Sequence, residues 1–374
     1  KVWQWSESER HAVYRAICPS CGKEAVDNHH AGYQASKLFS PWQKDKPSDI
    51  AKKYIDAKGD PDKEQAWWNT QMGLPHRPNH GKQLPVDVLL ARREIFPAVV
   101  PDGVALLTAG VDTQDDRFEI TITGWGRDEE SWSVAHDVIY GDLETEEPWK
   151  RLDAYLKQIW RRGDGRGLNI MATCMDSGGH HTQKVYEFAK ERLGRRVWAI
   201  KGESAQGGKR NPVWPTKRPS SKSKASFRPV ILGVNSAKDV IRGRLHLEPP
   251  KPGAAAAGYM HFPDDRDLGY FNQLLAERLV YKVISGQRFS IWEAIPGRAN
   301  EALDCLVYSY AALCGLKHMG LKLNVRAANL EADPDKFLPA PVGQEEKINY
   351  ELPGAVIEEP APVKRKRISQ LLPK

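Results

Sequence analysis

Three aspartates occupy positions at which carboxylates could bind divalent metal ions. Asp112 ends a β-rich run in GVDTQ, Asp176 ends a second run in CMDSGG, and Asp304 lies in the first turns of an expected helix in NEALDC. If the two runs are neighbouring strands, Asp112 and Asp176 emerge at one edge of a sheet, and the helix can bring Asp304 to it. Clustered carboxylates repel one another, so holding them together requires a cation.

The type of ligand predicts the metal and the reaction. Carboxylate oxygens favour Mg²⁺ or Mn²⁺ over zinc. Two such ions about 4 Å apart can activate a water molecule and stabilise the leaving oxygen in phosphodiester hydrolysis. Glu301 lies three residues before Asp304 on the same helical face and is a backup ligand. Each aspartate alone is equally consistent with a turn or a helix start, so the prediction rests on all three.

The order of the surrounding elements fits this arrangement. Residues 106–111, 118–125 and 131–139 are β-rich runs with short polar links, which predicts an antiparallel meander. Further elements are expected in the order helix, strand, helix, strand at 149–160, 168–175, 185–193 and 197–200. Regular structure resumes at 230–234, and helices are expected at 237–242, at 268–279 and from Asn300, a good N-cap. We therefore expect an α/β fold with a mixed sheet flanked by helices.

Composition divides the chain into three parts. Residues 1–98 form a polar, Trp-rich linker segment, residues 99–320 the α/β domain, and residues 321–374 a Pro-rich, charged tail that we expect to be disordered. The first residue is Lys1 rather than Met, which predicts a fragment of a longer protein. No apolar run of about 18 residues and no signal peptide occur, so a membrane protein and a secreted one are not expected.

Cysteine usage indicates a reducing cytoplasm. Five cysteines are too few and too scattered for a disulfide scaffold. Cys18 and Cys21 form a CxxC pair, which is typical of one half of a zinc site. His29 or His30 lies at no usual spacing from it, so a remnant without zinc remains the alternative. No ATP-binding P-loop is present, because the nearest mimic, around Lys209, lacks the following Ser or Thr.

The positive charge is concentrated. The chain has a formal net charge of +7, and residues 201–230 hold eight basic side chains and one acidic one. This composition predicts a flexible loop at 202–228 that binds a polyanion, with Trp214 and Phe227 placed to stack on bases. The predicted DNA-binding residues are Lys209, Arg210, Lys217, Arg218, Lys222 and Lys224. A solvated linker is the alternative. The stretch after Asp176 predicts either a phosphate-binding helix start or a simple tight turn; it consists of Gly178, Gly179, His180 and His181.

Several stretches together resemble the C-terminal nuclease part of the large terminase subunit of lambda-type tailed phages. They are GVDTQDDRFE at 110–119, MDSGGHHT at 175–182, HFP at 261–263 with YFNQ at 270–273, and NEALDCLVY at 300–308. LFSPW at 38–42 and NTQMGLP at 69–75 resemble the segment that joins the motor to the nuclease.

The resemblance implies an RNase H-like endonuclease that cuts concatemeric, end-to-end joined viral DNA during packaging in the host cytoplasm. The acidic triad of the family maps onto Asp112, Asp176 and Asp304. The resemblance also implies double-stranded DNA, the portal protein and the small terminase subunit as partners, and an ATPase domain upstream that this chain lacks. Two alternatives remain: another RNase H-like nuclease such as a resolvase, and a non-catalytic DNA-binding or docking module.

Overall fold

The computed structural model describes residues 2–5, 14–17, 22, 35–42, 45–58, 60–74, 84–165, 167–203, 210–216, 228–251, 256–284 and 287–332. The chain separates into two compact units, residues 1–338 and 339–374. Every element described below belongs to the first unit. Within the described residues, no helix is both long and apolar enough to cross a membrane.

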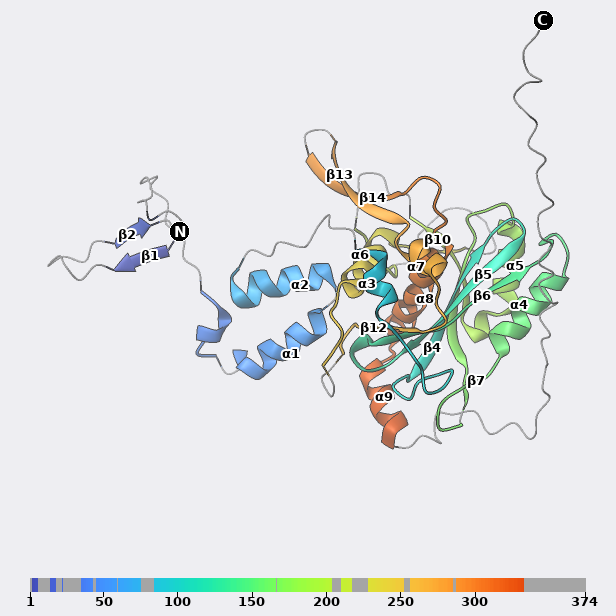
Figure 1. Cartoon of the computed structure of the whole chain (residues 1–374), viewed down its shortest axis with the longest axis horizontal. Coiled ribbons are helices and arrows are strands. Elements are labelled where there is room, and N and C mark those ends of the chain that lie inside the picture. The colour runs from blue at the N-terminus through green and yellow to red at the C-terminus, as the bar shows by residue number, and fades with distance from the viewer. Residues whose placement is uncertain are drawn as a thin grey trace, which may run out of the picture. The chain divides into compact units, whose positions relative to one another are not determined.

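An eight-stranded mixed sheet forms the centre of this unit (Figure 1). Its strands, in spatial order, are β11 (Val230–Leu232), β10 (Val197–Gly202), β9 (Ile170–Asp176), β4 (Leu106–Thr113), β5 (Arg117–Trp125), β6 (Ser131–Tyr140), β12 (Met260–Pro263) and β3 (Arg93–Glu94). The β4–β5–β6 meander is antiparallel, and β9, β10 and β11 extend the sheet in parallel from β4. The expected mixed sheet is therefore confirmed.

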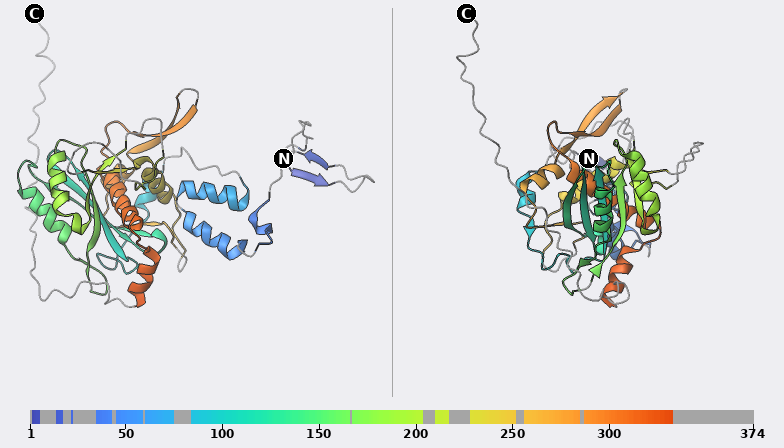
Figure 2. Two further views of the ribbon diagram at one scale, coloured as in Figure 1. Left: turned by 180° about the vertical axis from the view of Figure 1, so that it is seen from behind. Right: turned by 90° about the vertical axis from the view of Figure 1, so that its right-hand side faces the viewer.

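Helices cover both faces of the sheet, which is why β4 is buried along its whole length. On one face, α4 (Glu147–Lys157) and α5 (Thr182–Glu191) pack on a core that includes Leu107, Val111 and Phe118. On the other face lie α3 (Val86–Leu90), α6 (Val234–Leu245), α7 (Leu268–Leu274) and α8 (Glu301–His318). Figure 2 shows α8 on the opposite side of the sheet from α4 and α5.

The described part of the N-terminal segment contains two helices before α3. They are α1 (Pro47–Ala57) and α2 (Pro61–Trp67), and a π-helical turn at Trp68–Met72 continues α2. Both helices begin with proline, whose missing N–H costs nothing at that position, and Asp60 caps α2 by accepting from the amide of Lys63. The shorter elements are β1 (Val2–Trp5), β2 (Tyr14–Ile17), β7 (Trp160–Arg161), β8 (Gly167–Leu168) and the 3₁₀ turns Lys37–Phe39, Arg127–Glu129 and Leu193–Arg195.

The helix expected over 268–279 is too long. It ends at Leu274, and a two-stranded antiparallel hairpin follows, formed by β13 (Glu277–Ile284) and β14 (Gln287–Ala294). The β-branched and aromatic residues of LVYKVI at 279–284 favour a strand over a helix. This hairpin places Glu277 beside the start of α8.

The tail begins later than the sequence indicates. Residues Leu323–Ala332 form α9, and Leu323, Ala327 and Leu330 are buried in the same core as α8. Arg326 Nε also donates to the carbonyl of Ala105 at 2.9 Å. The domain boundary predicted at residue 320 is therefore wrong for this helix, because the helix packs on the core of the domain. Its apolar stripe, with spacings of four and three residues, is short. Residues 333–374 lie outside the described part of the chain.

Candidate active site

Asp112 and Asp176 end neighbouring parallel strands, as the sequence predicts. Val111 of β4 pairs with Met175 of β9, so the two aspartates that follow stand side by side at the sheet edge. The hydroxyl of Thr113 donates to the carbonyl of Asp176 at 3.0 Å, which ties the two strand ends together. Asp112 is almost completely buried.

Helix α8 crosses β4 so closely that its first turn reaches this edge. A methyl group at Gly110 would overlap the carbonyl oxygen of Cys305 and lie 2.6 Å from the amide nitrogen of Ser309. One helical turn further along α8, the hydroxyl of Thr108 donates to the carbonyl of Ser309 at 2.9 Å. Each two-residue step along β4 thus corresponds to about one turn of α8. The step from Gly110 to Asp112 therefore reaches the first turn of α8, which holds Asp304.

The pKa values of all three carboxyl groups are raised, as expected where buried carboxylates have too little positive charge near them. Burial, and next the negative charge of Asp304, raise the pKa of Asp112 to about 7. Burial also raises the pKa of Asp176. The pKa of Asp304 is raised as well, chiefly by burial, although the ammonium of Lys238 opposes the change. Carboxyl groups with these properties bind protons or metal ions in preference to remaining as bare charges.

Each aspartate has a partner of its own in this structure. Asp112 accepts from the side-chain amide of Gln114, and Asp176 Oδ2 accepts from the amide of Gly178 at 3.2 Å. Asp304 Oδ2 accepts from Asn300 Nδ2 at 2.8 Å. Asn300 stands at the N-cap position, but it does not cap α8 as expected, because its side chain is used for this contact. Among the described residues, no three Asp, Glu, His or Cys side chains form a ready-made metal-ligand group.

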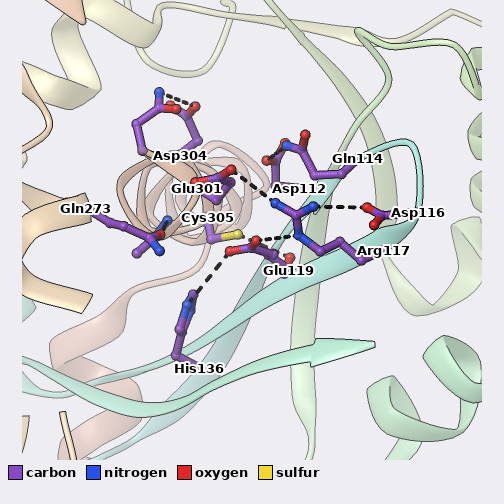
Figure 3. Close-up of polar contacts among 12 residues, drawn as sticks. Asp112, Gln114, Asp116, Arg117, Glu119, His136, Gln273, Glu301, Asp304 and Cys305 are labelled. Atoms are coloured by element: carbon purple, nitrogen blue, oxygen red, sulfur yellow. Dashed lines mark hydrogen bonds and ion pairs between the residues drawn. The ribbon is translucent and has the colours of Figure 1, made fainter. Parts of the chain in front are cut away.

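Arg117 organises a second group of acids next to Asp112 (Figure 3). Its guanidinium donates to Glu119 at 2.8 Å, to Asp116 at 2.9 Å and to Glu301 at 3.2 Å. Glu301, the predicted backup ligand, thus points to Arg117 through Oε1. Its Oε2 is buried and has no hydrogen-bond partner in the described part of the chain.

Sequence reasoning did not single out the charged residues Arg117, Glu119, Lys238 and Glu277 of this region. Glu119 pairs with Asp112 across β4 and β5 and is buried. In the sequence, Glu119 occupies a polar position of a strand that alternates between apolar and polar residues, which predicts an exposed side chain. The side chain is buried because α8 covers that face of the sheet. Burial raises the pKa of Glu119, with Arg117 opposing.

Lys238 ion-pairs with Glu277 at 2.6 Å and with Asp304 at 3.3 Å. The signal for it was available, since Lys238 lies three and seven residues before the buried Ile241 and Leu245 on the apolar stripe of α6. Burial lowers the pKa of Lys238, but the charges of Asp304 and Glu277 outweigh it, and the net shift is upward.

The turn after Asp176 joins two loops at the sheet edge. His180 Nδ1 lies 2.8 Å from Asp115 Oδ1, and His181 Nε2 lies 3.2 Å from the Asp115 carbonyl. His181 also pairs with Glu144 at 3.1 Å. Both histidines therefore tie the β9–α5 turn to neighbouring loops.

The basic loop is partly folded onto the core. Trp214, expected to stack on bases, is partly buried, packs with its ring centroid 4.8 Å from that of Trp198, and also lies over Gly315. Arg210 pairs with Asp239 and donates to the Ser290 carbonyl at 3.1 Å, so this guanidinium holds the loop to α6 and β14. The interpretation of 202–228 as one flexible loop is wrong for residues 210–216. The remaining predicted DNA-binding residues Lys209, Lys217, Arg218, Lys222 and Lys224, with Phe227, lie outside the described residues, as do Cys18, Cys21, His29 and His30.

Comparisons with known proteins agree with this picture. A family model described as "Terminase large subunit gpA, endonuclease domain" matches residues 30–327. The terminase large subunit of Escherichia phage lambda is 35% identical over 309 residues, and that of Enterobacteria phage P21 is 33% identical over 305 residues. Each match covers 80% of this chain and 46% of the relative, so the chain spans about half the length of these relatives.

A solved structure of the large terminase nuclease from thermophilic phage G20c, with bound magnesium, is also similar. It is 13% identical with a TM-score of 0.34, and the match covers 63% of this chain and 98% of the other. The family match spans most of the present chain, including all three aspartates and α8. The chain therefore belongs to the gpA family of phage terminase large subunits and contains its endonuclease domain.

Proposed function

We propose that this chain is a metal-dependent endodeoxyribonuclease that cuts concatemeric, double-stranded viral DNA during genome packaging. The observation that supports it most is the meeting of two strand ends and a helix start, which brings Asp112, Asp176 and Asp304 to one edge. Burial and mutual repulsion raise the pKa of Asp112 to about 7. A divalent cation would relieve this repulsion more effectively than a proton.

The donor set fits Mg²⁺ or Mn²⁺. All three predicted ligands are carboxylates, and the buried, unpartnered Oε2 of Glu301 is a fourth oxygen nearby that lacks a donor among the described residues. Asp112 and Asp176 would hold an ion between adjacent strand ends, with Asp304 joining from α8. When bound, two ions would supply an activated water and stabilise the leaving oxygen of a phosphodiester.

The protein itself would orient these ligands. Gln114 holds Asp112, the Gly178 amide holds Asp176, and Asn300 holds Asp304, so each carboxylate has a defined rotamer before metal binds. Arg117 holds Glu119 and Glu301 and thus fixes the first turn of α8 against β5. Such preorganisation lowers the cost of reaching the geometry needed for in-line attack.

The basic residues of the 202–228 segment would contact the DNA backbone. We assign this role to Lys209, Lys217, Arg218, Lys222 and Lys224, because this dense group of cations directly follows β10, the strand beside β9 and its Asp176. Arg210 would act indirectly by fixing the loop to α6. The small terminase subunit, the portal protein and an ATP-driven motor would be the partners of the complete protein in the host cytoplasm.

Cleavage of supercoiled plasmid tests this proposal. The wild type should cut with Mg²⁺ or Mn²⁺ and not with EDTA, whereas Asp112→Asn and Asp176→Asn should lose cutting while remaining folded. Glu187→Gln, at an exposed carboxylate on α5, is the matched control and should cut normally. Folded wild-type protein that binds DNA but never cuts would favour a docking module, and preferential cutting of four-way junctions would favour a resolvase.

A further inference from the structure

Lys238 is a buried cation in direct contact with the proposed metal site. Its side chain is 10% exposed, and its ammonium lies 2.6 Å from Glu277 Oε1 and 3.3 Å from Asp304 Oδ1. The two acids come from β13 and α8, whereas Lys238 comes from α6. Three elements distant in sequence therefore meet at one ammonium group.

Asn300 reinforces the same junction. Its Nδ2 donates to Asp304 Oδ2 at 2.8 Å and to Glu277 Oε1 at 3.1 Å. The side chains of Lys238 and Asn300 thus each bind both carboxylates, those of Glu277 and Asp304. Because Asp304 Oδ1 faces the ammonium and Oδ2 faces the amide, a metal ion that binds either oxygen must compete with a donor already in place.

A buried ion pair is not needed for packing alone. Removing lysine from water is costly, and an apolar residue often replaces a buried ion pair without loss of stability. Lys238 lies on the apolar stripe of α6, where Ile241 and Leu245 pack into the core, so an apolar side chain would suit the helix. The position of the ammonium at a proposed ligand points to a role in the site.

We infer that Lys238 is the resident cation of the carboxylate cluster: it holds Asp304 and Glu277 in place before metal binds, and it competes with a divalent ion for Asp304. This inference rests on the proposed metal-dependent function. Lys238 is a positioning residue, since it acts through Asp304. It keeps the first turn of α8 and the base of the β13–β14 hairpin together when the metal is absent.

Two variants should change metal binding in opposite directions. In Lys238→Met, Asp304 loses its competing ammonium, so Mn²⁺ should raise the unfolding temperature more than it does in the wild type. In Glu277→Gln, the ammonium is left with Asp304 alone, so the rise caused by Mn²⁺ should be smaller than in the wild type. Cleavage by Lys238→Met should fall about 100-fold at saturating Mn²⁺, because Asp304 is no longer held in position.

Lys317→Met is the matched control. Lys317 lies near the C-terminal end of α8, far along the helix from Asp304, and it also pairs with a largely buried glutamate, Glu129 of the 3₁₀ turn Arg127–Glu129. Its loss should lower the unfolding temperature and leave the Mn²⁺-dependent rise and the cleavage rate unchanged.

The experiment is thermal unfolding of the full chain, with and without Mn²⁺, alongside plasmid cleavage. Opposite changes in the two variants support the inference. An Mn²⁺-dependent rise equal to that of the wild type in both variants overturns it, and so does normal cleavage by Lys238→Met. If Lys238→Met does not fold, the Glu277→Gln result decides alone. Absence of any Mn²⁺ effect in the wild type would instead overturn the proposed function, and the inference with it.

Discussion

Gly110 of β4 lies directly against the backbone of Cys305 in α8, with no room for a side chain between them. Gly110 precedes Asp112 by two residues, and Cys305 follows Asp304 directly. The contact therefore sets how closely the helix that holds one predicted ligand approaches the strand that holds another. The glycine in GVDTQ is a structural requirement of the site.

Gly110→Ala should separate α8 from β4. The added methyl group would overlap the Cys305 carbonyl, and both partners are backbone, so the helix itself must shift. We expect a loss of stability of about 3 kcal/mol or more, at or above the usual cost of overpacking, together with loss of cleavage. Urea unfolding measures the first effect.

Gly194→Ala is the control, because a Cβ there meets nothing within 4 Å and its backbone is not in the left-handed region. It should change stability by less than about 1 kcal/mol. Equal stability of the Gly110→Ala variant and the wild type would contradict the close approach of α8.

Stability should depend on pH through Asp112. Its pKa is raised from 3.8 to about 7 in the folded protein, so folding favours the protonated form. The stabilisation is complete below pH values of about 4 and is lost as the pH rises towards 7. In EDTA, the free energy of unfolding should therefore fall over this range by up to about 1.4 kcal/mol per pH unit from this group.

Asp112→Asn should flatten that pH dependence, because the amide does not titrate. Urea unfolding at several pH values across this range is the measurement. Saturating Mg²⁺ should reverse the trend in the wild type, since the metal binds the deprotonated carboxylate. A slope unchanged by the substitution would assign the pH dependence to other groups.

DNA binding should separate the cations of the basic segment into two kinds. Replacing Lys209, Lys217 and Arg218 by Ala should reduce the slope of log affinity against log salt by about 0.9 for each phosphate that the protein no longer neutralises. Arg210→Ala should leave the slope nearly unchanged, because that guanidinium is already paired with Asp239 and bound to Ser290. Fluorescence anisotropy with duplex DNA at several salt concentrations measures both slopes, and a larger effect from Arg210 would reverse these assignments.

Truncation should locate the end of the nuclease domain. Removing residues 339–374 should leave cleavage intact, since they form a separate unit. Removing residues 323–374 should destabilise the protein, because α9 buries Leu323, Ala327 and Leu330 and Arg326 binds the Ala105 carbonyl. Thermal unfolding and plasmid cleavage of both truncations test this. Normal stability of the shorter protein would show that α9 is dispensable.

The sheet and the strand-end acids were predictable because their signals are local. Runs such as 118–125 have a strand period, and Asp112 and Asp176 end such runs. The surroundings of Asp304 were less predictable, since Lys238 and Glu277 reach it only through the packing of α6 and β13. The alternation of polar and apolar residues in β5 does not predict that α8 buries Glu119. Likewise, the position of Trp214 in a Lys-rich segment does not predict its contact with Gly315.

The most direct test of the central claim is a crystal structure of the protein soaked in Mn²⁺, with anomalous scattering used to locate the ions. We expect two Mn²⁺ ions about 4 Å apart, with Asp112, Asp176 and Asp304 as ligands. The same soak of Asp112→Asn should show weaker peaks or none. Strong Mn²⁺ peaks elsewhere, with the three carboxylates still bound to Gln114, Gly178 and Asn300, would contradict the assignment of this edge as the active site.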